Sequence, residues 1–332
     1  MKAAELTDYG PAENFRIVDL PTPEPGPGEA LIKVEFAGLR WGDIMGRNGI
    51  PVRRRTPPFV PGQEAAGIVV KNGDGASRFA PGDRVYCMPQ GNAYQEYLAV
   101  SERALRRVPD NVSLEQSLIY PVNLPTAYML IYEWAKVQEG ETVLIHAAAG
   151  GVGSLVVQVL KRRFENVTVI GLCGSDEKAA AARANGADHA INYKSVDYVQ
   201  AVSDIAGAKP RGFHPEAPPA GVHVVLNGVG GETLKKDRRV IRRLGRWVLF
   251  GTTAGIEPIN LFENSYDSIT IMPFSKIPFR GTEADRRAEE FTAAWMRTEK
   301  LDEPTVHPIE DIAAVQRAME NGETTGKVVF RL

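Results

Sequence analysis

The hydrophobic pattern divides the chain into regions of different character. In the first third, short apolar or alternating runs are broken by Gly and Pro, which is typical of a compact β-rich domain. Helical spacing begins near residue 114. From residue 142 onward, short apolar runs alternate with helical segments, which predicts a parallel sheet covered on both faces. Strands are expected at residues 29–36, 67–71, 85–88, 94–100, 143–145, 167–171, 189–193, 221–226 and 246–250.

The C-terminal part returns to a mixed pattern. A strand is expected at residues 268–272, a helix at 284–300 and a last strand at 324–330. Earlier helices are expected at 114–119, 126–134, 155–160 and 177–184. This tail is too small to form its own core, so we expect it to complete the N-terminal domain. Residues 207–221 contain four prolines and no periodicity, which predicts a surface loop.

Composition narrows the class of protein. The 332 residues suit two domains, and the net charge of −2 gives no bulk attraction to nucleic acid or anionic membranes. Two cysteines exclude a disulfide framework and a four-cysteine zinc site. No signal peptide or membrane-spanning run is evident, so we expect a cytoplasmic protein.

A glycine-rich segment in the middle of the chain carries the strongest functional signal. It follows the apolar run at 142–145 and precedes the apolar helix at 155–160. Such a strand, turn and helix bind a dinucleotide pyrophosphate, because glycine lets the backbone approach the phosphates and the helix N–H groups face the anion. The expected contacts are Gly150, Gly151, Val152 and Gly153.

The end of the next strand indicates which nucleotide binds. NAD enzymes normally place Asp or Glu at this tip to hold both ribose hydroxyls. Here Cys173 and Gly174 occupy the tip, and Ser175 and Lys178 follow. A hydroxyl and an ammonium group would hold a 2′-phosphate, and Tyr193 can add a donor, so we predict NADPH. Asp176 and Glu177 either oppose this assignment or lie at the start of the next helix.

A series of motifs resembles the medium-chain dehydrogenase/reductase superfamily, in particular its zinc-free quinone oxidoreductase branch. These motifs span nearly the whole chain, at residues 38–43, 61–67, 81–85, 124–128, 147–153, 191–193, 229–232 and 326–328. The resemblance implies an α/β fold with a GroES-like catalytic domain and a doubly wound Rossmann domain. It implies that residues 1–122 form the first part of the catalytic domain, that residues 123–264 form the NADPH-binding domain, and that residues 265–332 return to the catalytic domain. It also implies a homodimer.

The resemblance also bears on metal chemistry. Zinc-dependent members carry cysteine where this chain has Arg40 and histidine where it has Gln63. A guanidinium and an amide cannot replace those ligands, so no metal site is expected. The simplest reaction is then hydride transfer to a quinone or another conjugated carbonyl, whose developing negative charge needs only hydrogen-bond donors.

The resemblance places further residues near the ligands. Asn123 and Thr126 are expected to flank the nicotinamide. Arg40 and Asp43 either meet an anionic acceptor or form a pair that fixes a loop. Gln63 either binds an acceptor carbonyl or supports its turn, and Tyr128 faces cofactor or core. Strand ends at the ligand crevice add Asn227, Phe250, Gly251 and Thr252 to the cofactor set.

Two alternative functions remain. The first is an enoyl-thioester reductase, which Arg40 and the basic residues 53–55 favour because such substrates carry phosphates. The second is an NADPH-binding protein with little or no catalysis, since metal-free hydride transfer leaves no obligatory catalytic side chain.

Overall fold

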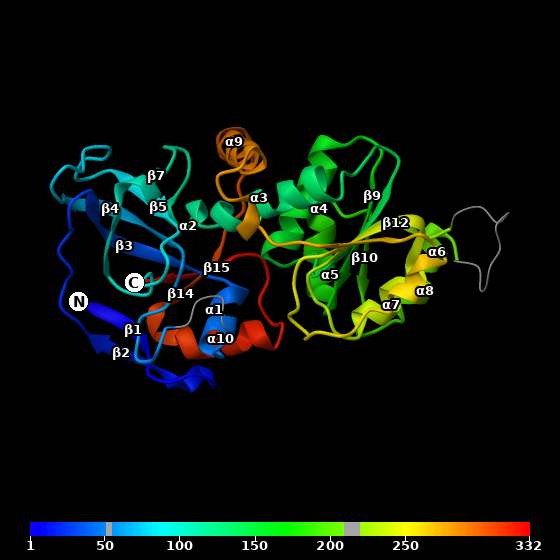
Figure 1. Cartoon of the computed structure of the whole chain (residues 1–332), viewed down its shortest axis with the longest axis horizontal. Helices are drawn as coiled ribbons and strands as arrows, with labels where there is room; N and C mark the ends of the chain where they lie inside the picture. The colour runs from blue at the N-terminus through cyan, green and yellow to red at the C-terminus, as the bar shows by residue number, and fades with distance from the viewer. Residues whose placement is uncertain (51–54, 209–219) are drawn as a thin grey trace. The chain divides into compact units, whose positions relative to one another are not determined.

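The computed structural model describes residues 1–50, 55–208 and 220–332 (Figure 1). It divides into two compact units. Unit 1 comprises Met1–Val122 and Thr292–Leu332, and unit 2 comprises Asn123–Phe291. The predicted positions Arg53 and Arg54, and most of the predicted loop at 207–221, lie outside the described residues.

Unit 1 is built on a seven-stranded sheet in the order β14-β15-β3-β4-β5-β7, with β6 also paired to β3. A separate two-stranded sheet joins β1 and β2. The strands are β1 (Lys2–Leu6), β2 (Phe15–Asp19), β3 (Glu29–Leu39), β4 (Ala65–Asn72), β5 (Arg84–Cys87), β6 (Tyr97–Ser101), β7 (Arg106–Arg107), β14 (Thr305–Pro308) and β15 (Val328–Arg331). Its helices are α1 (Trp41–Arg47), α2 (Leu114–Ser117) and α10 (Ile312–Glu320).

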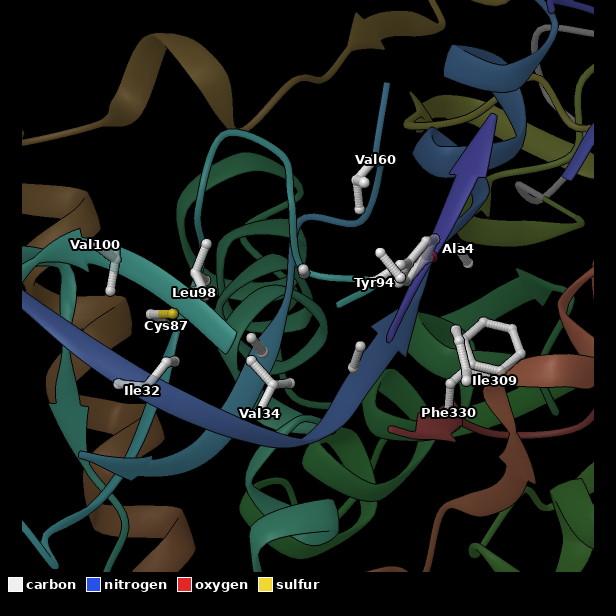
Figure 2. Close-up of a cluster of buried hydrophobic side chains, with 14 of the residues drawn as sticks. Ala4, Ile32, Val34, Val60, Cys87, Tyr94, Leu98, Val100, Ile309 and Phe330 are labelled. Carbon is white, nitrogen blue, oxygen red and sulfur yellow. The ribbon is translucent and has the colours of Figure 1, made fainter. Parts of the chain in front are cut away.

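The core of unit 1 joins residues from both ends of the chain. Figure 2 shows Ile32 and Val34 of β3 in one cluster with Leu98 of β6 and Phe330 of β15. The ring of Tyr94 packs edge-on against Phe330, with ring centroids 5.6 Å apart. Because β15 pairs antiparallel with β3, the C-terminal strand belongs to the sheet of this unit.

Unit 2 is a six-stranded parallel sheet in the order β10-β9-β8-β11-β12-β13. Renumbered within the unit, this is the order 3-2-1-4-5-6 of the doubly wound Rossmann fold. The α/β fold class predicted from the sequence is therefore confirmed. The strands are β8 (Thr142–His146), β9 (Thr168–Cys173), β10 (His189–Asn192), β11 (Val222–Asn227), β12 (Ile241–Leu249) and β13 (Thr270–Pro273).

Helices connect the strands of unit 2. They are α4 (Gly151–Arg163), α5 (Asp176–Ala184), α6 (Tyr198–Ala206), α7 (Thr233–Val240) and α8 (Leu261–Ser265). α3 (Tyr120–Tyr128), a π-helical turn (Met129–Trp134) and α9 (Glu283–Thr298) complete the fold. The strands β8, β9 and β11 are almost wholly buried, because helices cover both faces of such a sheet.

The division between the units differs from the sequence expectation at one point. Residues 265–291, expected to return to the first domain, group with unit 2. The reason is that β13 pairs in parallel with β12 and adds the sixth strand to the Rossmann sheet. Over the described part of the chain, none of the helices has the length and apolarity needed to cross a bilayer.

Candidate functional site

The turn between β8 and α4 carries the predicted pyrophosphate site. The first hydrogen bond of this turn of helix runs from the Ser154 N–H to the Gly150 carbonyl, at 2.9 Å. The N–H groups of Gly151, Val152 and Gly153 come before it and have no partner within the helix. Together with the helix dipole they offer an anion a ready set of donors.

Gly153 is required by the tight folding of this turn. A Cβ atom on Gly153 would lie 2.2 Å from the carbonyl oxygen of Ala147, a distance that real Cβ atoms do not reach. Ala147 itself has a positive φ of 51°, which turns the chain sharply after β8. The glycine therefore lets the first turn of α4 lie directly against the loop that precedes it.

Polar and cationic side chains surround the end of β9. The Ser175 hydroxyl accepts a hydrogen bond from the Lys178 N–H at 3.3 Å and so caps α5. The Tyr193 hydroxyl lies 3.0 Å, and Lys194 Cε 3.8 Å, from where a Cβ atom on Gly174 would be. Tyr193 is 44% exposed, so this residue is not enclosed in the core of the unit.

The two acidic residues after this strand occupy the first turn of α5. Asp176 accepts a hydrogen bond of 2.9 Å from the Asn192 amide. The pKa of Glu177 is lowered by its own backbone N–H and then by the Ser175 hydroxyl. These contacts agree with the helix-start interpretation of the acidic pair. Lys194 was missed by the sequence analysis, although its place directly after a predicted strand is a usable signal.

The turns that follow β11 and β12 are bonded to each other. The Phe250 N–H donates to the Asn227 carbonyl at 2.9 Å, and the Ala254 N–H donates to the Val229 carbonyl at 2.8 Å. Gly230 and Gly231 have φ values of 73° and 55°, which favour glycine. The predicted residues Phe250, Gly251 and Thr252 lie in this paired turn, at the carboxyl ends of the strands.

The side chain of Asn227 differs from its predicted role. Its Nδ2 donates to Thr233 Oγ1 at 2.8 Å and to Asp237 Oδ2 at 2.6 Å. Its Oδ1 accepts from the backbone N–H groups of Val229 and Gly230 at 2.8 and 2.9 Å. Both donors and both acceptor positions are thus filled, so this buried amide shapes the turn and has none left for a cofactor.

A buried carboxylate joins this turn to the strand that precedes the glycine-rich segment. Asp237 of α7 also accepts from the Tyr198 hydroxyl at 2.9 Å and lies 2.7 Å from His146 Nε2. All four side chains are buried, which confirms the interpretation of His146 as a satisfied core residue. Through Asp237, the last residues of β8 and β11 are held to the same helix.

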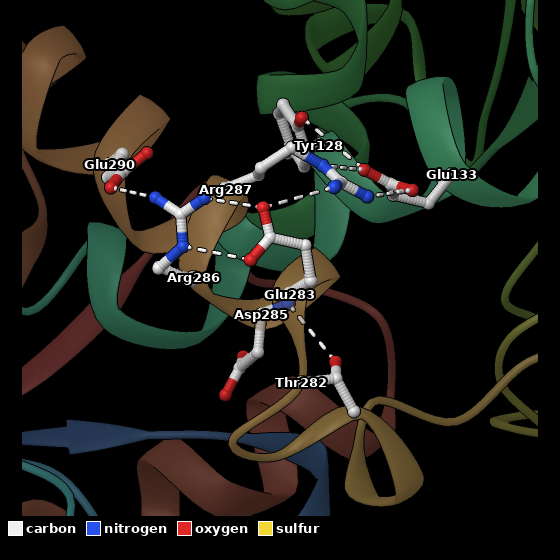
Figure 3. Close-up of polar contacts among 8 residues, drawn as sticks. All are labelled: Tyr128, Glu133, Thr282, Glu283, Asp285, Arg286, Arg287 and Glu290. Atoms are coloured by element: carbon white, nitrogen blue, oxygen red, sulfur yellow. Dashed lines mark hydrogen bonds and ion pairs between the residues drawn. The ribbon is translucent and has the colours of Figure 1, made fainter.

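Tyr128 lies in an aromatic and ionic cluster of unit 2 (Figure 3). Its hydroxyl donates to Glu133 at 3.4 Å, and Glu133 accepts two bonds of 2.9 Å from Arg287. The Tyr128 ring packs against Tyr132 and Phe291, with centroids 4.9 and 5.1 Å away. Burial raises the pKa of Tyr128, and Glu133 adds to the effect. These contacts correspond to the core alternative and leave the hydroxyl poorly suited to proton donation.

Asn123 and Thr126 precede Tyr128 on α3 and are both buried. Unit 2 begins at Asn123, within this helix. The role of both residues beside the nicotinamide stays a prediction.

In unit 1, Arg40 and Asp43 lie at the start of α1 and belong to a cluster of charged side chains. Asp43 Oδ2 accepts from the Arg40 N–H at 2.9 Å and from the Tyr94 hydroxyl at 3.2 Å. The Arg40 Nε atom lies 4.0 Å from Asp43 Oδ2 and 3.8 Å from Glu64 Oε1. Lys327 pairs with the other oxygen of Glu64 and donates to the Leu39 carbonyl.

This cluster contains two cations and two anions in a buried setting. Burial raises the pKa of Asp43, and the nearby Arg40 opposes that shift. Burial also raises the pKa of Tyr94, and Asp43 adds to the effect, so the phenol stays neutral. The Glu64–Lys327 contact joins residues 263 positions apart, and no sequence pattern indicated it.

Gln63 precedes Glu64 and is half-buried. Its side chain makes no hydrogen bond within residues 1–50, 55–208 and 220–332, so the amide is available to a ligand. Arg55, by contrast, donates to the Val60 carbonyl at 2.9 Å and to Asn92 at 3.0 Å. That part of the basic segment 53–55 therefore serves the structure of unit 1.

Two family models match the chain. Residues 26–110 match the alcohol dehydrogenase GroES-like domain, and residues 151–289 match the zinc-binding dehydrogenase domain. A 2-haloacrylate reductase of Burkholderia is 34% identical over 79% of this chain and 77% of its own length. The chain belongs to the medium-chain dehydrogenase/reductase superfamily.

Further relatives of the chain differ in length and description. The human synaptic vesicle membrane protein VAT-1 homolog is 33% identical over 76% of this chain, which spans only 61% of that protein. The structure of Escherichia coli quinone oxidoreductase complexed with NADPH superimposes with a TM-score of 0.87, at 26% identity, over all of both chains.

The residues of the chain do not fit the zinc in the name of one family model. Across the described ranges, no group of three or more His, Cys, Asp or Glu side chains can hold a metal ion. Glu64, the acid that remains at the family position, is paired with Lys327 and faces Arg40. Two cationic side chains thus surround the one carboxylate that a divalent ion would need as a ligand.

Proposed function

We propose that the chain is an NADPH-dependent reductase that transfers hydride to a quinone or another conjugated carbonyl without a bound metal. The observation that carries the proposal is the tightly folded turn at 147–153, whose helix N–H groups suit a pyrophosphate. The E. coli quinone oxidoreductase of the same fold binds NADPH in its crystal.

The preference for NADPH rests on the charges around the end of β9. Lys194 and Tyr193 lie against Gly174, and Ser175 and Lys178 begin α5 beside it. Asp176 and Glu177, the nearest acids, are held at the helix start. A 2′-phosphate placed at Gly174 would thus meet hydroxyls and ammonium groups, and we propose that these select NADPH over NADH.

The acceptor side of the proposal rests on unit 1. Bound NADPH would supply the hydride, and the chain's own task is to hold an acceptor whose oxygen gains negative charge. The Gln63 amide makes no hydrogen bond to a described residue, and Arg40 has a cationic side chain, so both groups are suited to that oxygen. The similar 2-haloacrylate reductase bears the name of a conjugated acceptor with a carboxylate, so the acceptor need not be a quinone.

The cofactor assignment is tested by titrating the intrinsic fluorescence of the protein with NADPH and with NADH. Lys178→Ala and Lys194→Ala should each weaken NADPH binding about 10- to 100-fold, because a charge-assisted hydrogen bond is worth roughly 1.5–3 kcal/mol. NADH binding should change little. Lys71→Ala, an exposed lysine of unit 1 paired with Glu24, is the control.

The reaction is tested by following NADPH oxidation with 1,4-benzoquinone and with simple enones. Turnover of either class supports the proposal. Tight NADPH binding with no turnover of any acceptor would favour the non-catalytic alternative, and absence of binding by both nucleotides would refute the assignment of the turn.

A further inference from the structure

Arg40 differs from the other buried arginines of unit 1 in how its guanidinium is used. Arg47, seven residues later, is bonded to Gln316 at 3.2 Å and paired with Glu320. Arg55 is bonded to Val60 and Asn92. The guanidinium groups of Arg47 and Arg55 thus bind to other residues of unit 1.

None of the five guanidinium N–H groups of Arg40 donates to a described residue. Its Nε atom is buried and unpartnered, since the nearest carboxylate oxygens lie at 3.8 and 4.0 Å. Its side chain keeps 23% of its surface exposed. The cation is thus anchored electrostatically at its inner nitrogen, while the terminal nitrogens Nη1 and Nη2 are left for another group.

The two carboxylates near Arg40 take their hydrogen bonds from groups other than its guanidinium. Lys327 pairs with Glu64, and Asp43 accepts from the Arg40 backbone and from Tyr94. A carboxylate facing Nη1 and Nη2 would form two parallel charge-assisted bonds, which is the geometry that the guanidinium group favours. A neutral carbonyl would leave most of these donors unfilled.

We propose that Arg40 is a specificity-determining residue that binds the carboxylate of an anionic conjugated acceptor, such as an α,β-unsaturated acid. This inference rests on the proposed reductase function and names its substrate class. The acceptor's double bond gains a hydride at one carbon from the reduced nicotinamide, which is oxidised. The other carbon gains a proton from solvent, so the product is the saturated acid.

The test uses two acceptors with the same reducible bond and different charge. These are 4-oxo-2-pentenoate and its methyl ester, each assayed for kcat/KM with NADPH. We expect the wild-type protein to prefer the acid, and Arg40→Asn to lower that preference about 10- to 100-fold, as loss of a charged hydrogen-bond pair predicts. Arg40→Lys should restore part of the preference, because it keeps the charge and loses the fork.

A second readout needs no turnover. Calorimetric titration of the nucleotide-free protein with 4-oxopentanoate, the saturated acid, should show binding that Arg40→Asn abolishes and that methyl 4-oxopentanoate lacks. Arg107→Gln, which removes an exposed arginine paired with Asp83, should leave both readouts unchanged. Thermal melting of each variant shows whether it is folded.

The outcomes separate this proposal from the general function. If acid and ester are reduced equally and Arg40→Asn affects both alike, Arg40 has a structural role and the proposal is overturned while the reductase function stands. If neither acceptor is reduced but 4-oxopentanoate binds through Arg40, the carboxylate site is supported and the proposed reaction fails. If quinones turn over and the saturated acid does not bind, the proposal is again overturned.

Discussion

Replacing Gly153 by alanine should damage the nucleotide-binding turn, although the same change stabilises an ordinary helix. An alanine in place of glycine within a helix normally gains about 1 kcal/mol. Here the new Cβ atom would lie 2.2 Å from the Ala147 oxygen, 2.9 Å from its carbonyl carbon and 3.0 Å from Ala148 Cα. All three atoms belong to the backbone, so no side chain can rotate away.

The size of the effect follows from that geometry. Contacts below 3.0 Å essentially never occur for real Cβ atoms, so the turn must move by roughly 0.8 Å or more. Overpacking of this kind typically costs about 1–3 kcal/mol, which exceeds the gain in helix propensity. The N–H groups of residues 151–153 move with the turn, and we expect NADPH to bind at least about tenfold more weakly.

Urea denaturation followed by circular dichroism measures the stability, and fluorescence titration measures NADPH binding. Gly46→Ala in α1 is the matched control, because a Cβ atom there meets nothing within 4 Å. It should leave NADPH binding unchanged and stability equal or higher. A Gly153→Ala protein with wild-type stability and affinity would refute the proposed role of this turn.

Three further predictions concern other parts of the structure. Asp237→Ala should lower the free energy of unfolding by about 2–4 kcal/mol in urea denaturation, because three buried donors lose their acceptor. A decrease of less than about 1 kcal/mol would show that these hydrogen bonds to Asp237 do not stabilise the fold. Burial raises the pKa of the Cys87 thiol to about 12, so at pH 8 only about one molecule in 10⁴ carries the thiolate. We therefore expect iodoacetamide to modify Cys87 at a measurable rate only after the protein unfolds, which mass spectrometry can show. We also propose that the edge strand β13 pairs with a second copy of the chain, beside Leu261 and Phe262, which are 70% and 69% exposed. Phe262→Asp should then convert the dimer to a monomer in analytical ultracentrifugation. A wild-type protein that sediments as a monomer would refute this assignment.

The parts of the fold set by local pattern were predictable from the sequence. Buried parallel strands appear as short apolar runs, and the glycine-rich turn stands between a strand and a helix, so β8, β9 and α4 were anticipated. The helix at 120–128 was expected to begin only at 126, because Pro125 normally interrupts a helix. Helices α6 and α7 were not predicted, because their formation depends on packing against the sheet, which the local pattern does not reveal.

The candidate site was predictable only where residues are neighbours in sequence. The glycine-rich turn at 150–153 and the start of α5 at the acidic pair Asp176 and Glu177 follow from local chemistry. The contacts of Asp237 with Tyr198 and His146 span 39 and 91 positions, and such pairs depend on the topology of the sheet. Asn227 was assigned to the cofactor because its strand ends at the ligand side, but its amide is filled by partners that only the folded turn brings close.

The path of the chain through the two units has a consequence for synthesis. Every strand of unit 2 lies between residues 142 and 273, whereas β3 in unit 1 must wait for β15 at 328–331 to cover its free edge. During translation the Rossmann sheet can close while residues 36–39 of β3 still lack their partner strand β15 and the core of unit 1 lacks the side chain of Phe330. An exposed sheet edge is a template for aggregation. Once residues 328–331 have left the ribosome, β15 can cover this edge, and the period in which the edge of unit 1 is open to aggregation ends.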